Sequence, residues 1–185
     1  MFLCDGRAFE DILQVWEFAS NFNEFLDIPP FKLEELYAAL RYSEAGEIAL
    51  LKELFVALCH VLLEEVSSED AEEEEELLFL LRSYAEEKIE LIWPAALSLI
   101  MKSEAFVMNM EPELQPLAHR LACVLPDNFS REFSYEEKLA LLRYLVFSAY
   151  DMPSFRDFMK ERLNEKNGLS RQKQETYVLI KNLQK

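Results

Sequence analysis

Two cysteine–histidine pairs are the residues of this chain whose types and spacing best suit metal chemistry. His60 directly follows Cys59, and His119 lies four residues before Cys123, a spacing that places both side chains on one helical face. Two ligands do not complete a site, and no further set of cysteines and histidines is present to do so. We therefore interpret the cysteines as buried structural residues and expect no metal and no cofactor.

Sequence motifs of catalysis are also missing. The chain has no glycine-rich phosphate loop, no nucleophile elbow and no recognisable acid–base pair among its many carboxylates. We therefore predict that the protein is not an enzyme and has no small-molecule substrate. The alternative is a hydrolase with an unrecognised site, which no residue pattern supports.

The charge of the chain is strongly negative and unevenly distributed. The formal net charge is −16, from 35 acidic and 19 basic side chains. Residues 131–185 carry 8 of the acidic and 11 of the basic side chains, so residues 1–130 carry the other 27 and 8. This field repels phosphate backbones and attracts basic polypeptides, so any DNA contact is expected in the C-terminal third.

The composition favours an all-α protein without a membrane span. Hydrophobic residues make up 51% of the chain and only 3 glycines occur, while strand-type alternation is scarce. No secretory signal and no long uncharged apolar run is evident, and 3 cysteines do not suggest a disulfide framework. We expect a soluble protein of the cytosol or nucleus.

Apolar residues spaced three and four apart predict helices along most of the chain. The first helix should break within Ser20–Asn23 and end at Pro29 and Pro30, because proline restricts the residue before it and lacks an N–H donor. A short helix over 33–40, a turn over 43–46 and a long helix over 48–63 should follow. These helices form a predicted three-helix domain over 1–66.

Nine carboxylates without a base lie between Glu64 and Glu76, which predicts a partly disordered acidic hinge, assigned to 67–76. Helices should follow over 77–89, from Pro94 and over 112–124. Ser134 and Glu137 form a predicted capping box at the start of the next helix.

Pro153 and Ser154 should open the following helix, and Gly168 should cap its C-terminus. The predicted regions are therefore a helical region over 77–168 and a polar final helix over 169–185.

The N-terminal region resembles the DDT domain, a three-helix module of chromatin-remodelling subunits and homeobox-associated transcription regulators. About 60 residues of the chain carry the likeness. Lys32 departs from the family, which usually has a serine-like helix cap there, a local loss of about 1 kcal/mol. The residues that carry the likeness are Trp16, Glu17, Phe18, Phe22, Leu26, Pro30, Leu33, Glu34, Leu36, Ala39 and Leu40, followed by the apolar helix 48–63.

The stretch "FSYEEKLALLRYLVFSAYDMPSFRDFMKERLNE" resembles the first WHIM motif, which follows DDT domains in accessory subunits of imitation-switch (ISWI) remodelling complexes. Trp93 sits where that family often carries a tryptophan before its intervening helices. The resemblance implies a DDT-like bundle packed with a WHIM-like bundle, a nuclear location and docking to the ISWI-type ATPase subunit. The second WHIM motif is absent after Gly168, which puts the family's linker-DNA spacing role in doubt for this chain.

The expected partner contacts are acidic or exposed. Glu17 either caps a neighbouring helix or pairs with an arginine of the partner. The run Glu72, Glu73, Glu74, Glu75 and Glu76 is either a solvated flank or a landing surface for basic segments. On the WHIM-like helix the exposed candidates are Tyr135, Lys138 and Arg143.

The aromatic residues at helical spacing and the basic tail each allow two interpretations. Trp16, Phe18, Phe22 and Phe25 could line a peptide groove, but we interpret them as core, together with Leu36, Leu40 and Trp93.

Lys160, Arg162 and Lys166 could contact DNA as part of a basic stripe that also holds Arg171 and Lys173. Interspersed glutamates favour ordinary ion pairing on the helix surface. A linker-DNA or nucleosome-binding module acting through this tail is therefore the alternative function.

Overall fold

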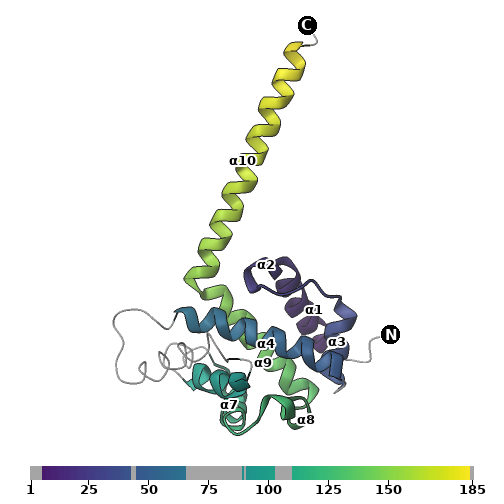
Figure 1. Cartoon of the computed structure of the whole chain (residues 1–185), viewed down its shortest axis with the longest axis vertical. Helices are drawn as coiled ribbons and strands as arrows, with labels where there is room; N and C mark the ends of the chain where they lie inside the picture. The colour runs from purple at the N-terminus through teal and green to yellow at the C-terminus, as the bar shows by residue number, and fades with distance from the viewer. Residues whose placement is uncertain (1–5, 43–44, 66–88, 90, 103–109, 184–185) are drawn as a thin grey trace.

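The computed structural model describes residues 6–42, 45–65, 89, 91–102 and 110–183. Every regular element in these residues is a helix, which confirms the predicted all-α class. A compact body holds most of the helices, and one long helix rises from it to the C-terminus (Figure 1). The elements are α1 (Gly6–Asn21), α2 (Asn23–Leu26), α3 (Leu33–Arg41), α4 (Ala45–Glu65), a helix over 91–102, η1 (Pro112–Leu114), α7 (Gln115–Leu121), η2 (Pro126–Asn128), α8 (Phe129–Glu132), α9 (Tyr135–Asp151) and α10 (Pro153–Leu183).

The predicted break after the first helix is confirmed. α1 ends at Asn21, Phe22 interrupts the helix, and the single turn of α2 follows. Asp27 then closes α2 with a φ of 51°, a left-handed conformation that aspartate tolerates better than most residues. Pro29 and Pro30 hold the next residues out of the helix, so the chain turns before α3.

The start of α3 compensates for the missing serine-like cap. The side chain of Lys32 has no hydrogen-bond acceptor atom and so cannot cap the helix. Its backbone N–H, however, donates to Oε2 of Glu35 at 2.7 Å. This is the glutamate half of a capping box. The predicted turn before α4 is too long, because α4 already begins at Ala45 and therefore includes Gly46.

α9 is the central element of the body. Its predicted capping box is confirmed, since the Glu137 N–H donates to Ser134 Oγ at 3.2 Å and the Ser134 N–H donates to Glu137 Oε2 at 2.8 Å. α9 packs against α1, α3, α4 and α10. Its buried residues face several directions, so the DDT-like helices and α9 share one core. These residues are Lys138, Leu139, Leu141, Leu142, Tyr144, Leu145, Val146 and Ala149.

An aromatic stack joins α4 to the helices that follow it. Phe55 of α4 stacks on Trp93 at 4.8 Å between ring centroids, and Phe129 meets Trp93 edge-on at 4.6 Å. The Ser98 hydroxyl donates to the Ala118 carbonyl at 2.5 Å inside the same region. The second half of the body is thus attached to the long apolar face of α4.

α10 runs from Pro153 to Leu183 as one helix of 31 residues, about 46 Å long at 1.5 Å per residue. Its predicted start is confirmed, but the predicted C-cap at Gly168 is wrong. None of the described glycines has a positive φ, so Gly168 continues the helix at the usual modest cost of about 1 kcal/mol. The expected polar final helix is therefore the distal part of α10, which projects from the body (Figure 1).

Two further predictions concern residues that the structure does not describe. The acidic hinge over 67–76 and the helix over 77–88 lie outside the described residues. The helices that are described include none with the length and apolar character of a membrane span.

Candidate protein interface

α1 and α9 lie side by side and run in the same direction. Asp11 meets Arg143, and Phe18 meets Tyr150 with ring centroids 4.9 Å apart. Both pairs are separated by 132 residues, so the contacts advance together along the two helices. A groove of about 340 Å³ opens between them. It is lined by Gln14, Val15, Glu17, Phe18, Asn21, Phe22, Arg143, Val146, Phe147 and Tyr150.

Two exposed aromatic residues and an exposed carboxylate line this groove. Phe147 is 51% exposed and Tyr150 is 42% exposed, and Glu17 is exposed beside them. Burial of the Tyr150 hydroxyl raises its pKa, and the negative charge of Glu17 raises it further. In the described part of the chain Glu17 has no ion pair. Within the same residues the Glu17 side chain makes no hydrogen bond either, so none supports its interpretation as a helix cap.

Arg143 lies at the other end of the groove and is held by the protein itself. Its Nη1 lies 3.1 and 3.0 Å from the two carboxylate oxygens of Asp11, and its Nη2 lies 3.3 Å from Glu111 Oε1. The guanidinium also lies 5.9 Å from the ring centroid of Phe147. The structure thus brings together Glu17 and Arg143, two of the predicted partner-binding residues, but Arg143 is half-buried rather than exposed as predicted, and its ion-pair partners belong to the protein itself.

The prediction that Lys138 is an exposed contact is wrong. Its side chain is buried at 2% exposure, and Nζ donates to the Leu40 carbonyl at 3.3 Å, at the C-terminal end of α3. Burial lowers the pKa of this amine. The apolar stem of lysine allows such burial when the amine finds a helix-terminal carbonyl, a partner that sequence spacing does not reveal.

Tyr135 is half-buried rather than exposed, which also contradicts the prediction. Its ring packs against Arg41 of α3, with the guanidinium carbon 5.3 Å from the ring centroid. Arg41 lies equally close to Tyr37, at 5.2 Å. The start of α9 therefore faces α3.

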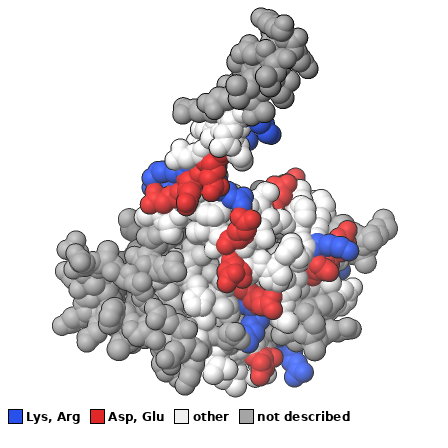
Figure 2. All heavy atoms as spheres, turned by 45° about the horizontal axis from the view of Figure 1, so that its top comes forward, with Lys and Arg blue, Asp and Glu red and all other residues white. Residues whose placement is uncertain are grey.

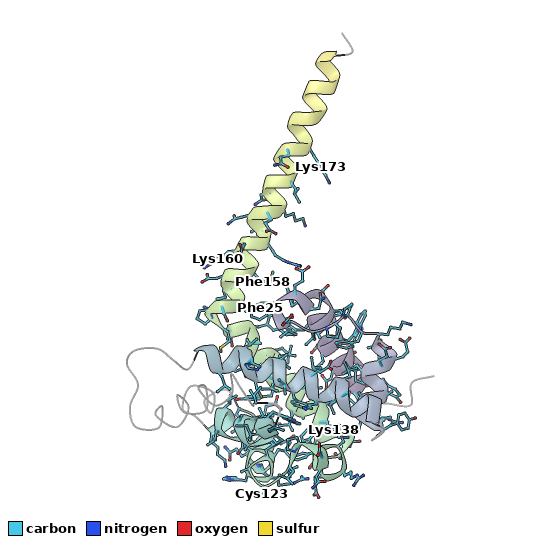
Figure 3. All side chains as sticks on the ribbon, viewed as in Figure 1. Phe25, Cys123, Lys138, Phe158, Lys160 and Lys173 are labelled. Atoms are coloured by element: carbon cyan, nitrogen blue, oxygen red, sulfur yellow. The ribbon has the colours of Figure 1, made fainter. Side chains whose placement is uncertain are left out.

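The basic stripe of α10 is partly neutralised near the body. Lys160 Nζ lies 2.6 Å from Asp157, and Arg162 forms an ion pair with Glu24 of α2. Lys166 is exposed farther along the helix. These pairs favour ordinary ion pairing over DNA contact for Lys160 and Arg162, while Lys173 lies on the projecting part of α10 (Figure 3).

An aromatic cluster that the sequence did not reveal fixes the base of α10. Phe22 and Phe155 meet edge-on at 4.8 Å, and Phe25 lies 5.1 Å from Phe158 (Figure 3). Phe18 joins the same cluster at 5.7 Å from Phe155. Phe22 and Phe25 are three residues apart in the sequence, and so are Phe155 and Phe158. This matching spacing does not predict that α2 and α10 contact each other.

The other residues of the predicted core signature lie in the body. Phe18, Leu36, Leu40 and Trp93 are at most 1% exposed. Trp16 is only half-buried, and its indole N–H donates to the Phe31 carbonyl at 3.1 Å, which ties α1 to the segment before α3.

Acidic side chains form a band over one face of the body, below the base of α10 (Figure 2). The predicted acidic landing surface Glu72, Glu73, Glu74, Glu75 and Glu76 lies outside the described residues. Among the described residues, the candidate contacts for a partner are therefore Glu17 and the exposed aromatic residues of the groove.

The two cysteines that the structure describes, Cys59 and Cys123, differ from one another. Cys59 is fully buried, and burial raises the pKa of its thiol to about 12. Cys123 is exposed, so the prediction that it is buried is wrong. It follows the end of α7 in a turn, where helical spacing no longer decides which side faces the core. Among the described residues no group of three or more His, Cys, Asp or Glu side chains is arranged to hold a metal ion.

Comparison with known proteins identifies the N-terminal part of the chain. No curated protein and no solved structure matches the sequence. The family model of the DDT domain matches residues 7–65, which span α1 to α4 and confirm the predicted resemblance of this region. Residues 7–65 are therefore similar to the DDT domain, a module found in chromatin-associated proteins.

Proposed function

We propose that this chain is a nuclear, non-catalytic scaffold of an ISWI-type chromatin-remodelling complex and that it binds the ATPase subunit. The observation that carries the proposal is the DDT domain over residues 7–65. The resemblance of residues 133–165 to the first WHIM motif supports the ISWI class, because DDT and WHIM occur in that order in such accessory subunits. The packing of α9 onto α1, α3 and α4 is compatible with one preformed docking module.

The mechanism is docking of a partner segment onto a negatively charged helical surface. The net charge of −16 steers basic polypeptides towards the chain, including ATPase segments and histone tails. The groove between α1 and α9 offers exposed aromatic rings for apolar anchors and Glu17 for a basic one. Association should therefore weaken as salt is added.

Affinity purification tests this function. The tagged full-length chain is incubated with nuclear extract, and the captured proteins are identified by mass spectrometry. Binding of a purified ISWI-type ATPase subunit is then measured at low and at high ionic strength. We expect capture of the ATPase and a salt-sensitive complex. Absence of any remodelling ATPase at low salt, or turnover of a substrate by the purified chain, would count against the proposal.

A second candidate function is linker-DNA binding through α10. The observation in its favour is the projection of α10 from the body, with five basic and two acidic side chains over residues 160–173. DNA binding that is lost when Lys160, Arg162 and Lys166 are replaced by alanine, together with no affinity for the ATPase, would favour this function. Replacement of Lys32, an exposed lysine of the body, is the matched control.

A further inference from the structure

The groove between α1 and α9 has an excess of negative charge. Glu17 and Arg143 line the groove, and Asp11 and Glu111 pair with Arg143 from outside the lining, so three carboxylates accompany one arginine. Two of these carboxylates pair with that arginine, at 3.0 and 3.3 Å. Glu17 is the remaining one, and within the described residues no basic side chain pairs with it. The unpaired negative charge of Glu17 thus favours the binding of one more cation beside it.

The neighbours of Glu17 suit a particular kind of cation. Phe147 and Tyr150 lie one turn apart on α9, and both remain substantially exposed at 51% and 42%. Exposed aromatic side chains that line the same groove as a carboxylate attract a cation together with it, the carboxylate by its charge and the rings by their quadrupole. The Tyr150 hydroxyl senses the carboxylate, since the charge of Glu17 contributes to the raised pKa of the phenol. The Glu17 carboxylate and the Tyr150 side chain therefore lie close enough for one cation to interact with both.

We propose that this groove receives an arginine side chain of the partner protein, with the guanidinium paired to Glu17 and packed against Phe147 and Tyr150. Arginine fits better than lysine because its planar, weakly hydrated head stacks on aromatic rings and can bond a carboxylate through two N–H groups. The volume of about 340 Å³ is at the small end of the range for ligand pockets, about 300 to 1,000 Å³, and suits one long side chain with its flanking residues. The proposal rests on the proposed function in taking the partner to be a basic protein segment.

Matched variants of the full-length chain test the site against the ATPase subunit. Glu17→Gln removes the charge and keeps the shape, and Glu10→Gln makes the same change at an exposed position of the same helix. Phe147→Ala removes the exposed ring, and Leu125→Ala truncates another exposed apolar residue, 67% exposed, elsewhere. We expect Glu17→Gln and Phe147→Ala each to weaken binding by about 10-fold or more, as for loss of one charge-assisted contact. The two control variants should bind as the unmodified chain does. Equal binding by all four variants would overturn the proposal while leaving the proposed function intact.

A direct probe separates the groove from the identity of the partner. N-acetyl-arginine-methylamide and the uncharged N-acetyl-citrulline-methylamide are titrated into the isotope-labelled chain and followed by NMR. We expect shifts around Glu17, Phe147 and Tyr150 with the arginine compound only, and their loss in Glu17→Gln. Equal shifts with citrulline, or arginine-induced shifts elsewhere only, would overturn the proposal.

Binding of the arginine probe in a chain that captures no ATPase would uphold the groove and reject the proposed partner. A concentration-dependent dimer in gel filtration that Glu17→Gln abolishes would show that a second copy of the chain is the occupant, and would overturn the assignment to a separate partner.

Discussion

Replacing Leu142 by alanine is expected to destabilise the DDT helices and the rest of the body together. Leu142 lies on α9, outside the residues that match the DDT domain, and is completely buried in the core that α9 shares with α1, α3 and α4. A buried leucine-to-alanine change costs about 2 to 5 kcal/mol, a large part of the about 5 to 15 kcal/mol that stabilise a typical domain. With a urea slope of about 2 kcal/mol per molar, the midpoint of unfolding should fall by about 1 to 2.5 M.

The two tryptophans of the chain report on the two parts separately. Trp16 lies in α1, and its indole N–H donates to the Phe31 carbonyl. Trp93 stacks on Phe55, in the aromatic stack that joins α4 to the helices after it. Urea unfolding is followed by fluorescence in Trp93→Phe, where Trp16 alone reports, and in Trp16→Phe, where Trp93 alone reports. Leu142→Ala should lower both midpoints by a similar amount.

The control is Phe147→Ala on the same helix, because its side chain is 51% exposed and its truncation should change the free energy of unfolding by about 0.5 kcal/mol. An unchanged Trp16 transition alongside a lowered Trp93 transition would refute the shared core. Two well-separated transitions in the parent chain would refute it as well, since one contiguous core should unfold cooperatively.

Three further changes have defined outcomes. Glu17→Gln should lower the pKa of Tyr150 towards its ordinary value of 10.0, because a carboxylate that opposes the phenolate is lost, while burial, the larger cause, keeps it higher; NMR of the tyrosine ring carbons measures this. Ser134→Ala should cost about 1 kcal/mol in urea unfolding by removing the N-cap of α9, and Ser134→Asp should retain most of it. Iodoacetamide at about pH 8 should alkylate exposed Cys123 but leave Cys59 unmodified until the chain unfolds, as mass spectrometry of the peptides would show.

The candidate interface could be predicted only in part. Glu17 stood out from its type and position beside the aromatic residues of the first helix, and Arg143 from its place on the later one. Their shared groove requires α1 and α9 to run side by side over a separation of 132 residues. Phe147 and Tyr150 were missed because their exposure depends on which face of α9 the other helices cover.

The sequence by itself determined the local structure of this protein. Helix boundaries depend on signals that act over a few residues and need no tertiary contacts. These signals are the prolines, the break around Phe22 and the capping pair of Ser134 and Glu137. Apolar spacing likewise fixed the class as all-α. The resemblance to the DDT domain could be recognised for the same reason, because the residues that carry it lie within residues 7–65.

The tertiary structure alone decided which polar side chains are available to a partner. Lys138 turns inward because the end of α3 offers it a carbonyl, and Arg143 is occupied because α1 and Glu111 approach it. Gly168 continues α10 although glycine often ends a helix, since its backbone stays in the helical region. Helical periodicity is a local pattern, so it does not indicate which distant segments pack together. Burial and ion pairing, in contrast, arise between segments far apart in the chain.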